Sequence, residues 1–325
     1  MKSGLRKSLT MVLILITTVL FVSACDSNTS DSDVYKIGIC QLVQHESLDA
    51  ATKGFQDALT EKLGDKVEFD LQNAAGDTAV CSTIVNQFVV DEVDLVMTNA
   101  TQALQAAMAA TADLPIVATS VTDFAKAIDV EEWTGVSGIN VTGTSDLAPL
   151  DQQAAMVRQL LPEAKTVGIL YCSAEVNSEY QVEVITDEFI ELGFDVKLYT
   201  IADTNEISSV TMTACDEVDC LFIPTDNSLA ITGTAVHEIA YPAGVPVVAS
   251  EIGICKGCGI ATLSIDYYDL GYEAGLMAYE ILENGADPAE MEIRYPEDLT
   301  KGYVAERMEY FNIEVPEDYE QIIVE

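Results

Sequence analysis

Basic side chains are scarce in this sequence. Its 325 residues include 15 Lys and Arg against 54 Asp and Glu, which gives a formal net charge of −39 at pH 7. Nucleic acids and anionic membrane surfaces are bound mainly through basic patches. The composition therefore argues against nucleic acid as a partner and against adsorption of the folded chain to an anionic bilayer.

The residues and motifs of catalysis are also missing. The chain has only two histidines, His45 and His237, and none of the motifs HExxH, GxSxG and GxxxxGK[ST] occurs in it. An enzyme needs a nucleophile with a positioned base, a metal cluster or a phosphate-binding loop. We therefore expect a protein that is not an enzyme and that uses no metal and no cofactor.

The N-terminus has the features of a bacterial signal peptide. Three basic residues precede the apolar run 11–22, which is too short to span a bilayer comfortably. Residues 22–25, Val-Ser-Ala-Cys, resemble a lipobox, although an ordinary signal peptide or an uncleaved anchor is the alternative. We expect residues 1–24 to be removed and residues 25–34 to form a polar tether with lipid on Cys25. The folded body would then sit on the outer face of the cytoplasmic membrane, with the lipid as its only membrane contact.

The mature chain is long enough for two domains. Removal of residues 1–24 takes away three basic residues and no acidic one, so the net charge changes from −39 to −42. Apolar residues make up 49% of the sequence, which is enough to bury a large core.

Eight cysteines allow several arrangements. Without Cys25 seven remain, an odd number that cannot all pair within the chain. Cys40 and Cys172 lie in apolar runs, where a free cysteine behaves as a small buried hydrophobic residue. Cys255 and Cys258 form the one close pair, for which a zinc site lacks a second CxxC, and a local disulfide or free thiols remain open.

The folded region alternates between apolar, strand-like runs and amphipathic segments. This alternation is typical of right-handed βαβ units on a parallel sheet. It stops at the passage 133–143 and then restarts, so we expect an α/β protein with two doubly wound parallel-sheet lobes. The expected strands are 35–43, 67–71, 95–98, 115–119, 166–172, 195–199, 221–223 and 246–249, and the expected helices are 47–63, 78–90, 101–112, 147–161, 178–192, 207–215 and 228–241.

Polar residues follow the expected strands of both lobes, where open α/β sheets bind ligands. The run 221–223 is followed by Pro224 and then by Thr225, Asp226 and Asn227. Asp226 is therefore a candidate acceptor for a cationic group, and capping of the next helix is the alternative. The candidate ligand-binding residues are Gln44, His45, Ala100, Thr101, Ser120, Thr122, Asp123, Ser173, Glu175, Asn177, Ser178, Asp226, Asn227 and Glu251.

None of the four arginines of the chain falls in these strand-end segments. A multiply charged anion such as a sugar phosphate would usually recruit arginine. Helix N-terminal amides and hydroxyl groups can hold a single carboxylate, and Asp226 can hold an ammonium group. The segments therefore favour a neutral or zwitterionic ligand, and solvated loops without a ligand are the alternative.

Six segments resemble, in order, the signature segments of ABC-transporter substrate-binding lipoproteins, a family with tryptophan- and tyrosine-binding members. The segments are LDAATKGF (48–55), QNAAGD (72–77), NVTGTSDL (140–147), LYCSAEVNSEYQVE (170–183), PTDNSLA (224–230) and IDYYDLGYEAG (265–275).

The resemblance implies a type I periplasmic-binding-protein fold, in which two α/β lobes joined by a hinge close on a small ligand. It implies hinge crossings at 140–144 and 265–270, and a helix at 271–282 that returns to the first lobe. An ABC permease in the membrane would be the partner, and the ligand would be a small molecule such as an amino acid. The implied first lobe is 35–143 plus 266–290, and the implied second lobe is 144–265 plus 291–325.

Within this family we expect an aromatic amino acid first, ahead of other amino acids and small amides. Aromatic ligands need apolar or π surface beside their polar anchors. Phe124, Tyr171, Tyr180 and Tyr267 lie near the candidate segments, and core or hinge packing is the alternative role for the tyrosines. A ligand sensor or a surface adhesin on the same fold is the alternative function.

Overall fold

The computed structural model describes residues 34–296 and 298–324. The expected signal peptide, the tether up to residue 33 and the lipidation site Cys25 lie outside the described residues. Residues 35–325 group into one unit by their contacts, apart from residues 1–34. No helix in the described part of the chain is long and apolar enough to cross a membrane.

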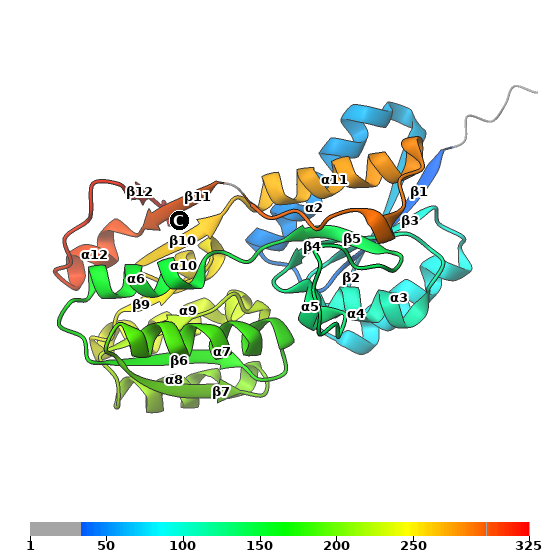
Figure 1. The fold of residues 1–325 in the computed structure, drawn as a ribbon. Coiled ribbons are helices and arrows are strands. Elements are labelled where there is room, and N and C mark those ends of the chain that lie inside the picture. Colours follow the sequence, from blue (N-terminus) through cyan, green and yellow to red (C-terminus); the bar gives the residue numbers. More distant parts are fainter. Residues whose placement is uncertain (1–33, 297, 325) are drawn as a thin grey trace, which may run out of the picture. The chain divides into compact units, whose positions relative to one another are not determined.

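Lobe 1 is built on a five-stranded parallel sheet with the order β2-β1-β3-β4-β5 (Figure 1). Helices α3 and α4 share one apolar cluster with the sheet, and helices α2 and α11 share another on the opposite face. The strands are β1 Tyr35–Gln41, β2 Val67–Asn73, β3 Leu95–Asn99, β4 Ile116–Val121 and β5 Val141–Ser145. The helices are α2 Glu46–Leu63, α3 Thr78–Val90, α4 Thr101–Ala110, α5 Phe124–Ala127 and α11 Tyr267–Asn284, with 3₁₀ turns η1 Gly64–Lys66 and η3 Pro288–Glu290.

Lobe 2 is built on a seven-stranded sheet with the order β12-β11-β10-β9-β8-β6-β7, in which β11 runs antiparallel to β10. Its two faces are covered by α6 and α7 on one side and by α8, α9 and α10 on the other. The strands are β6 Thr166–Cys172, β7 Asp195–Ile201, β8 Cys220–Ile223, β9 Val247–Ala249, β10 Ala261–Ile265, β11 Leu299–Tyr303 and β12 Glu320–Gln321. The helices are α6 Leu150–Leu160, α7 Val176–Glu191, α8 Ile207–Cys215, α9 Asn227–Ala243, α10 Ile252–Gly257 and α12 Ala305–Tyr310, with the 3₁₀ turn η2 Thr204–Glu206.

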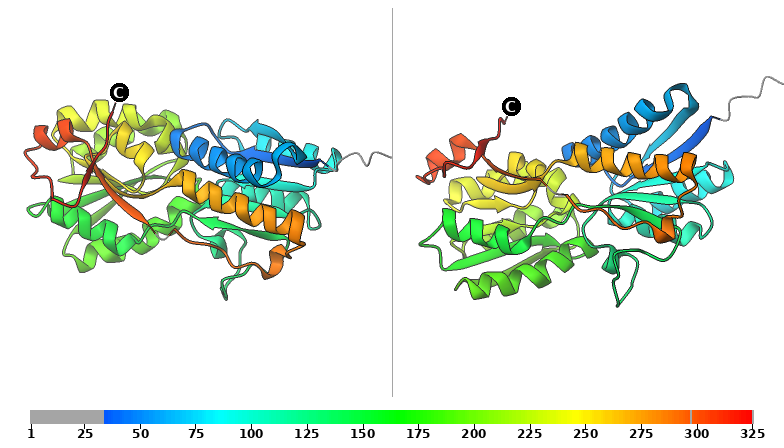
Figure 2. Two further views of the ribbon diagram at one scale, coloured as in Figure 1. Left: turned by 90° about the horizontal axis from the view of Figure 1, so that it is seen from above. Right: turned by 45° about the horizontal axis from the view of Figure 1, so that its top comes forward.

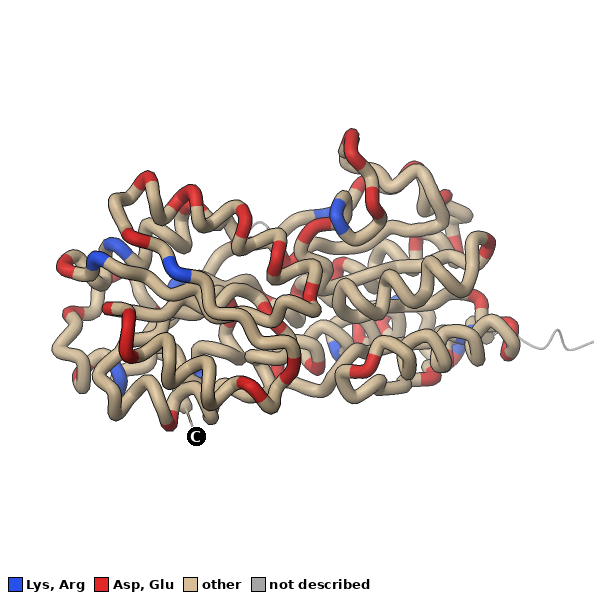
Figure 3. Tube along the Cα trace, turned by 90° about the horizontal axis from the view of Figure 1, so that it is seen from below, with Lys and Arg blue, Asp and Glu red and all other residues tan. Residues whose placement is uncertain are grey.

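The predicted α/β architecture of two doubly wound lobes is confirmed. The buried, hydrophobic environment predicted for Cys40 and Cys172 is confirmed too, since both thiols lie in apolar clusters. Both lobes carry an acidic surface: Asp and Glu are spread over them and far outnumber Lys and Arg (Figure 3).

The expected hinge crossing at 140–144 was wrong. Residues 141–145 form β5, which pairs with β4 inside the sheet of lobe 1, so the chain leaves this lobe only after Ser145. Gly143 permits this pairing, because it has a φ of 151° and a Cβ there would lie 1.8 Å from the Ala118 carbonyl oxygen. The second crossing is also shorter than expected: Asp266 caps α11, and the helix begins at Tyr267.

Helices α2 and α11 pack backbone against backbone, side by side in the views of Figures 1 and 2. A Cβ on Gly54 would lie 2.0 Å from the Tyr268 carbonyl oxygen, and a Cβ on Gly271 would lie 1.9 Å from the Ala51 carbonyl oxygen. Glycine at both positions therefore sets the distance between the helices. This contact fixes the start of α11, and with it Tyr267, against lobe 1.

Gly54→Ala is expected to lower the free energy of unfolding by about 2–3 kcal/mol, because the added methyl group meets backbone that cannot rotate away. Thr60→Ala is the matched control on the same helix, since Thr60 is exposed, and its effect should stay within about 0.5 kcal/mol. Urea unfolding followed by circular dichroism measures both. Equal stability of the two variants would contradict the close packing of α2 on α11.

Candidate ligand-binding site

A small cavity lies between the strand ends of the two lobes. Its free volume is about 10 Å³, roughly the space that one water molecule needs. A ligand as large as an amino acid can therefore enter only if the walls separate. The lining residues are His45, Leu48, Ser120, Thr122, Asp146, Asn177, Thr225, Asp226, Asn227, Ala230, Glu251 and Tyr267.

Lobe 1 presents helix N-termini without side-chain caps. The N-cap residues of α2 and α4, His45 and Ala100, make no capping hydrogen bond from their side chains. The buried hydroxyls of Thr101 and Ser120 also have no hydrogen-bond partner among the described residues. Free amides and hydroxyl groups at a helix N-terminus favour an anion.

The backbone is strained at the same strand ends. Ala100 follows β3 with a φ of 90°, and Ser120 near the end of β4 has a φ of 56°. Both values are unfavourable for residues with a side chain, and such strain often accompanies function. It aims the free groups of Ser120 and of the α4 N-terminus along the carboxyl edge of the sheet.

Lobe 2 treats its helix N-termini in the opposite way. The Asp226 carboxylate caps α9 through the Leu229 amide at 2.9 Å and also accepts from the Cys172 amide at 2.7 Å and the Ser178 hydroxyl at 2.8 Å. Glu175 accepts from the amides of Asn227 and Ser228. Carboxylates thus already occupy the first amides of α9, and the capping role considered for Asp226 is present in the structure.

Glu251 completes this set by capping α10. It accepts from the amides of Gly253 and Ile254 and from the hydroxyl of Ser47, which belongs to lobe 1. Burial, and then the nearby Glu175 carboxylate, raise the pKa of Asp226 above its usual range, although its hydrogen bonds act against this. The cavity wall of lobe 2 is consequently acidic.

Asp146 is the cavity residue that the sequence reasoning missed and that matters most. It follows β5 at the hinge, is 4% exposed, and accepts hydrogen bonds from the Thr122 hydroxyl at 2.9 Å and the Tyr267 hydroxyl at 3.0 Å. Burial raises the pKa of Asp146 to about 6 against the effect of these hydroxyls, and Glu251 raises it further. Burial and the Asp146 charge also raise the pKa of Tyr267 well above its usual value. No Lys or Arg lines the cavity to neutralise these groups.

Polar contacts hold the two lobes together around the cavity. Ser47 donates to Glu251, Lys256 of lobe 2 pairs with Glu46 of lobe 1, and a His45 ring nitrogen lies 3.3 Å from the Asn227 side-chain oxygen. Because the first of these contacts is buried, it excludes water from that side of the cavity.

Seven of the fourteen candidate residues line the cavity: His45, Ser120, Thr122, Asn177, Asp226, Asn227 and Glu251. Glu175 and Ser178 lie behind the wall and hydrogen-bond residues 226–228. The other five lie outside the lining: Gln44 is exposed, Ala100 and Thr101 begin α4, Asp123 caps α5, and Ser173 hydrogen-bonds the Ile201 carbonyl.

Five lining residues were not among the candidates: Leu48, Asp146, Thr225, Ala230 and Tyr267. Leu48 and Ala230 lie one helical turn after the N-caps His45 and Asp226, so helical spacing was a usable signal. Of the four aromatic residues considered, Tyr267 alone lines the cavity. Phe124 stacks with Trp133 in the core of lobe 1 and Tyr171 is buried in lobe 2, as the packing alternative predicted.

Comparison with known proteins gives consistent matches over most of the chain. A family model described as ABC transporter substrate binding protein matches residues 36–316. The sequence is 35% identical to the tyrosine-binding protein of Clostridioides difficile strain R20291, and the match covers 95% of each chain.

Two solved structures show the lobes in different arrangements. An ABC domain from Streptococcus pneumoniae in complex with L-Trp is 33% identical, with a TM-score of 0.85 over 89% of this chain and 100% of the other. The ligand-free, open structure of a substrate-binding protein with adhesive properties from Clostridium difficile is 34% identical, with a TM-score of 0.70 over 90% and 100%. At nearly equal identity the ligand complex superposes better, which agrees with the closed cavity described above. These matches show that the chain belongs to the family of ABC transporter substrate-binding proteins.

Proposed function

We propose that this protein captures an aromatic amino acid, tyrosine or tryptophan, outside the cytoplasm and delivers it to an ABC permease. The observation that carries the proposal is the division of charge across the cavity, with free anion-binding groups in lobe 1 and carboxylates at the hinge and in lobe 2. A zwitterion has the matching division. A relative named as a tyrosine-binding protein and a similar structure with L-Trp bound support the aromatic side chain.

The carboxylate of the ligand would bind at lobe 1. Ser120 lines the cavity with a hydroxyl that has no partner in the described structure, and the uncapped start of α2 lies beside it in the same lining. Hydrogen bonds from hydroxyl and amide groups to a carboxylate are charge-assisted and strong. They replace the arginine that the cavity lining lacks.

The ammonium group would bind at Asp146. Its two hydroxyl partners occupy only part of its acceptor capacity. Asp226 is a weaker choice, because three hydrogen bonds already engage it. We therefore move the expected ammonium acceptor from Asp226 to Asp146.

The aromatic ring would pack against Leu48, Ala230 and Tyr267, which supply the apolar and π surface of the lining. The Asn177 side-chain oxygen has no partner among the described residues, while its amide nitrogen donates to Glu175 and to the Thr225 carbonyl. A phenol or an indole N–H would satisfy that oxygen. Tyrosine and tryptophan should therefore bind more tightly than phenylalanine.

We also propose that lipid on Cys25 anchors the mature chain, since this fits a receptor that must stay near its permease. Adhesion is the second candidate function, because a 34% identical relative is described as having adhesive properties. Deletion of the cognate permease separates the two: loss of uptake of the bound amino acid supports transport, and unchanged uptake supports adhesion or sensing.

At pH 7.5, Asp146→Asn is expected to weaken binding of L-tyrosine about 10- to 100-fold, because a hydrogen bond to a charged group contributes about 1.5–3 kcal/mol. Asp123→Asn is the matched control: it removes one carboxylate outside the lining and keeps a residue that can cap α5, so its affinity should equal that of the wild type. Titration calorimetry measures both, with tyramine and 3-(4-hydroxyphenyl)propanoate as ligands that lack one charged group each. Equal binding of either analogue and of L-tyrosine would contradict the zwitterion site.

Binding should also depend on pH below neutrality. Because the pKa of Asp146 is about 6, affinity for L-tyrosine should fall as the pH drops below 6, approaching tenfold per pH unit while the ammonium group stays charged. The Asp146→Asn profile should lack this fall, which separates Asp146 from His45 in the same cavity. A wild-type affinity that is constant from pH 7.5 to 4.5 would argue against Asp146 as the acceptor.

Without ligand, the same carboxyl group should make stability depend on pH. The folded pKa of about 6 lies above the usual 3.8, so the folded state binds the proton more tightly. Stability is then highest below pH 4 and declines by at most about 3 kcal/mol as the pH rises to 6. Asp146→Asn should lack this contribution, so urea unfolding should show it gaining stability relative to the wild type between pH 4 and 7. A difference between the two proteins that is the same at every pH would exclude the shift.

A further inference from the structure

Helix α3 lies unusually close to strand β1. A Cβ on Gly38 would lie 2.6 Å from ring atoms of Phe88, so only glycine at that position allows the helix to approach this far. Residues 38 and 40 share one face of β1, and residues 81, 85 and 88 share one face of α3. The same packing therefore places Cys81 over Cys40.

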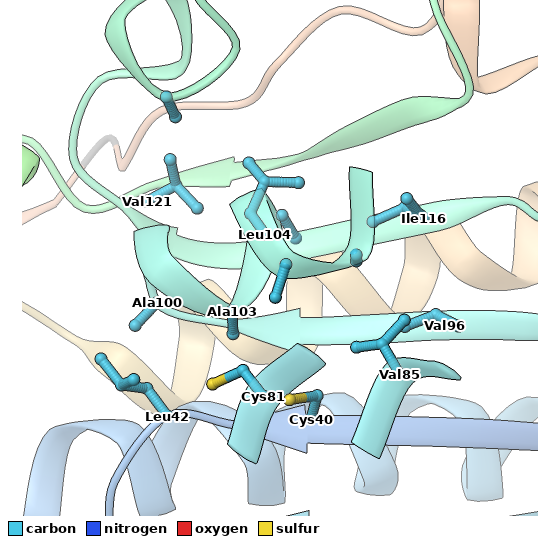
Figure 4. Close-up of a cluster of buried hydrophobic side chains, with 14 of the residues drawn as sticks. Cys40, Leu42, Cys81, Val85, Val96, Ala100, Ala103, Leu104, Ile116 and Val121 are labelled. Carbon is cyan, nitrogen blue, oxygen red and sulfur yellow. The ribbon is translucent and has the colours of Figure 1, made fainter. Parts of the chain in front are cut away.

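Cys40 and Cys81 lie next to one another in the core of lobe 1 (Figure 4). Both side chains are fully buried, and the two thiols form a hydrogen bond. This bond raises the pKa of Cys40 and lowers that of Cys81, which lies in the first turns of α3. A thiol with a lowered pKa at a helix N-terminus is the better nucleophile of such a pair.

We infer that Cys40 and Cys81 form a disulfide bond in the mature protein, which links β1 to α3. The inference is independent of which ligand the cavity takes. It uses the extracytoplasmic location of substrate-binding proteins, because disulfides form and persist outside the cytoplasm. The remaining cysteines of the described structure, Cys172, Cys215, Cys220, Cys255 and Cys258, stay as free thiols.

The bond forms by exchange with an external disulfide, such as that of a thiol-disulfide oxidoreductase or of oxidised glutathione. The Cys81 thiolate attacks one sulfur of the oxidant, which gives a mixed disulfide and releases one thiolate. Cys40 then loses its proton and attacks the Cys81 sulfur, which releases the second thiolate. The two protein thiols are oxidised by two electrons, the oxidant is reduced to two thiols, and the two protons pass to them. Because both groups are buried in the finished lobe, the exchange takes place while the lobe folds.

The bond would stiffen the edge of the site. The loop after β2 is already attached to the end of β1, since Ala74 donates to the Gln41 carbonyl at 2.9 Å and Gly76 donates to the Leu42 carbonyl at 2.8 Å. The chain continues from Leu42 to His45, which lines the cavity. A covalent link from Cys40 to α3 therefore holds the strand end that precedes the start of α2.

The test is thiol mapping of the full chain, refolded with a mixture of reduced and oxidised glutathione. Free thiols are alkylated in denaturant, and the peptides are then analysed without reduction. We expect one linked peptide pair that contains Cys40 and Cys81, and alkylation of the other five described cysteines. Complete alkylation of Cys40 and Cys81, or a link between Cys255 and Cys258 in their place, would overturn the inference.

Thermal unfolding gives an independent readout. Reduction with dithiothreitol should lower the midpoint of the wild type by roughly 5 °C or more, because the bond closes a segment of about 40 residues in the unfolded chain. The double variant Cys40→Ala, Cys81→Ala should not respond to the reductant, and Cys215→Ala, which keeps the pair, should respond like the wild type. Equal midpoints of the wild type with and without reductant would count against the bond even if the double variant does not fold.

Discussion

The buried carboxylate of Asp146 is the constraint on which the hinge depends. A carboxylate taken out of water needs hydrogen-bond donors, and its two donors come from separate segments, Thr122 after β4 and Tyr267 at the start of α11. Asp146 itself begins the crossing after β5. One hydrogen-bonded group therefore ties together the end of lobe 1 and both neighbouring crossings. The glycine contacts between α2 and α11 keep Tyr267 in the position where it can donate.

The two lobes share a fold and differ in how their helices begin. In lobe 2 the side chains of Glu175, Asp226 and Glu251 occupy the first amides of α9 and α10, so that lobe adds negative charge to the cavity and has few donors left there. In lobe 1 the helices α2 and α4 begin without side-chain caps. The same element, a helix N-terminus after a parallel strand, thus serves as an anion site in one lobe and as a support for acidic residues in the other.

Much of this could be predicted from the sequence, because strand and helix periods are local properties. The helices 78–90 and 207–215 and the strand 166–172 were predicted with the ends that the structure shows. The site was harder, since the pattern indicates where a strand ends but not how deeply each following residue is buried. Asp123 and Ser173 follow strands just as Thr122 and Asn177 do, yet only the latter two line the cavity.

Asp146 was missed for a related reason. Strand β5, VTGTS, is short and contains glycine, so it resembles a loop, and its role depends on pairing with β4 far away in the sequence. The short elements after residue 250, such as α10 and β11, owe their form to contacts across lobe 2. The four hydrogen bonds from Arg307 to carbonyl groups of residues 255–259 are an example. Contacts of this kind leave no periodic signal.

The charges in the cavity also explain why closure would depend on a ligand. In the closed arrangement Asp146, Asp226 and Glu251 are buried around one cavity, and no Lys or Arg lines it. Bringing like charges together out of water raises the free energy of the closed state, as the raised pKa of Asp146 shows. The contacts of Ser47 with Glu251 and of Glu46 with Lys256 act in the opposite direction. A bound ammonium group supplies the missing positive charge only when the lobes are closed, so such a ligand favours that state over the open one.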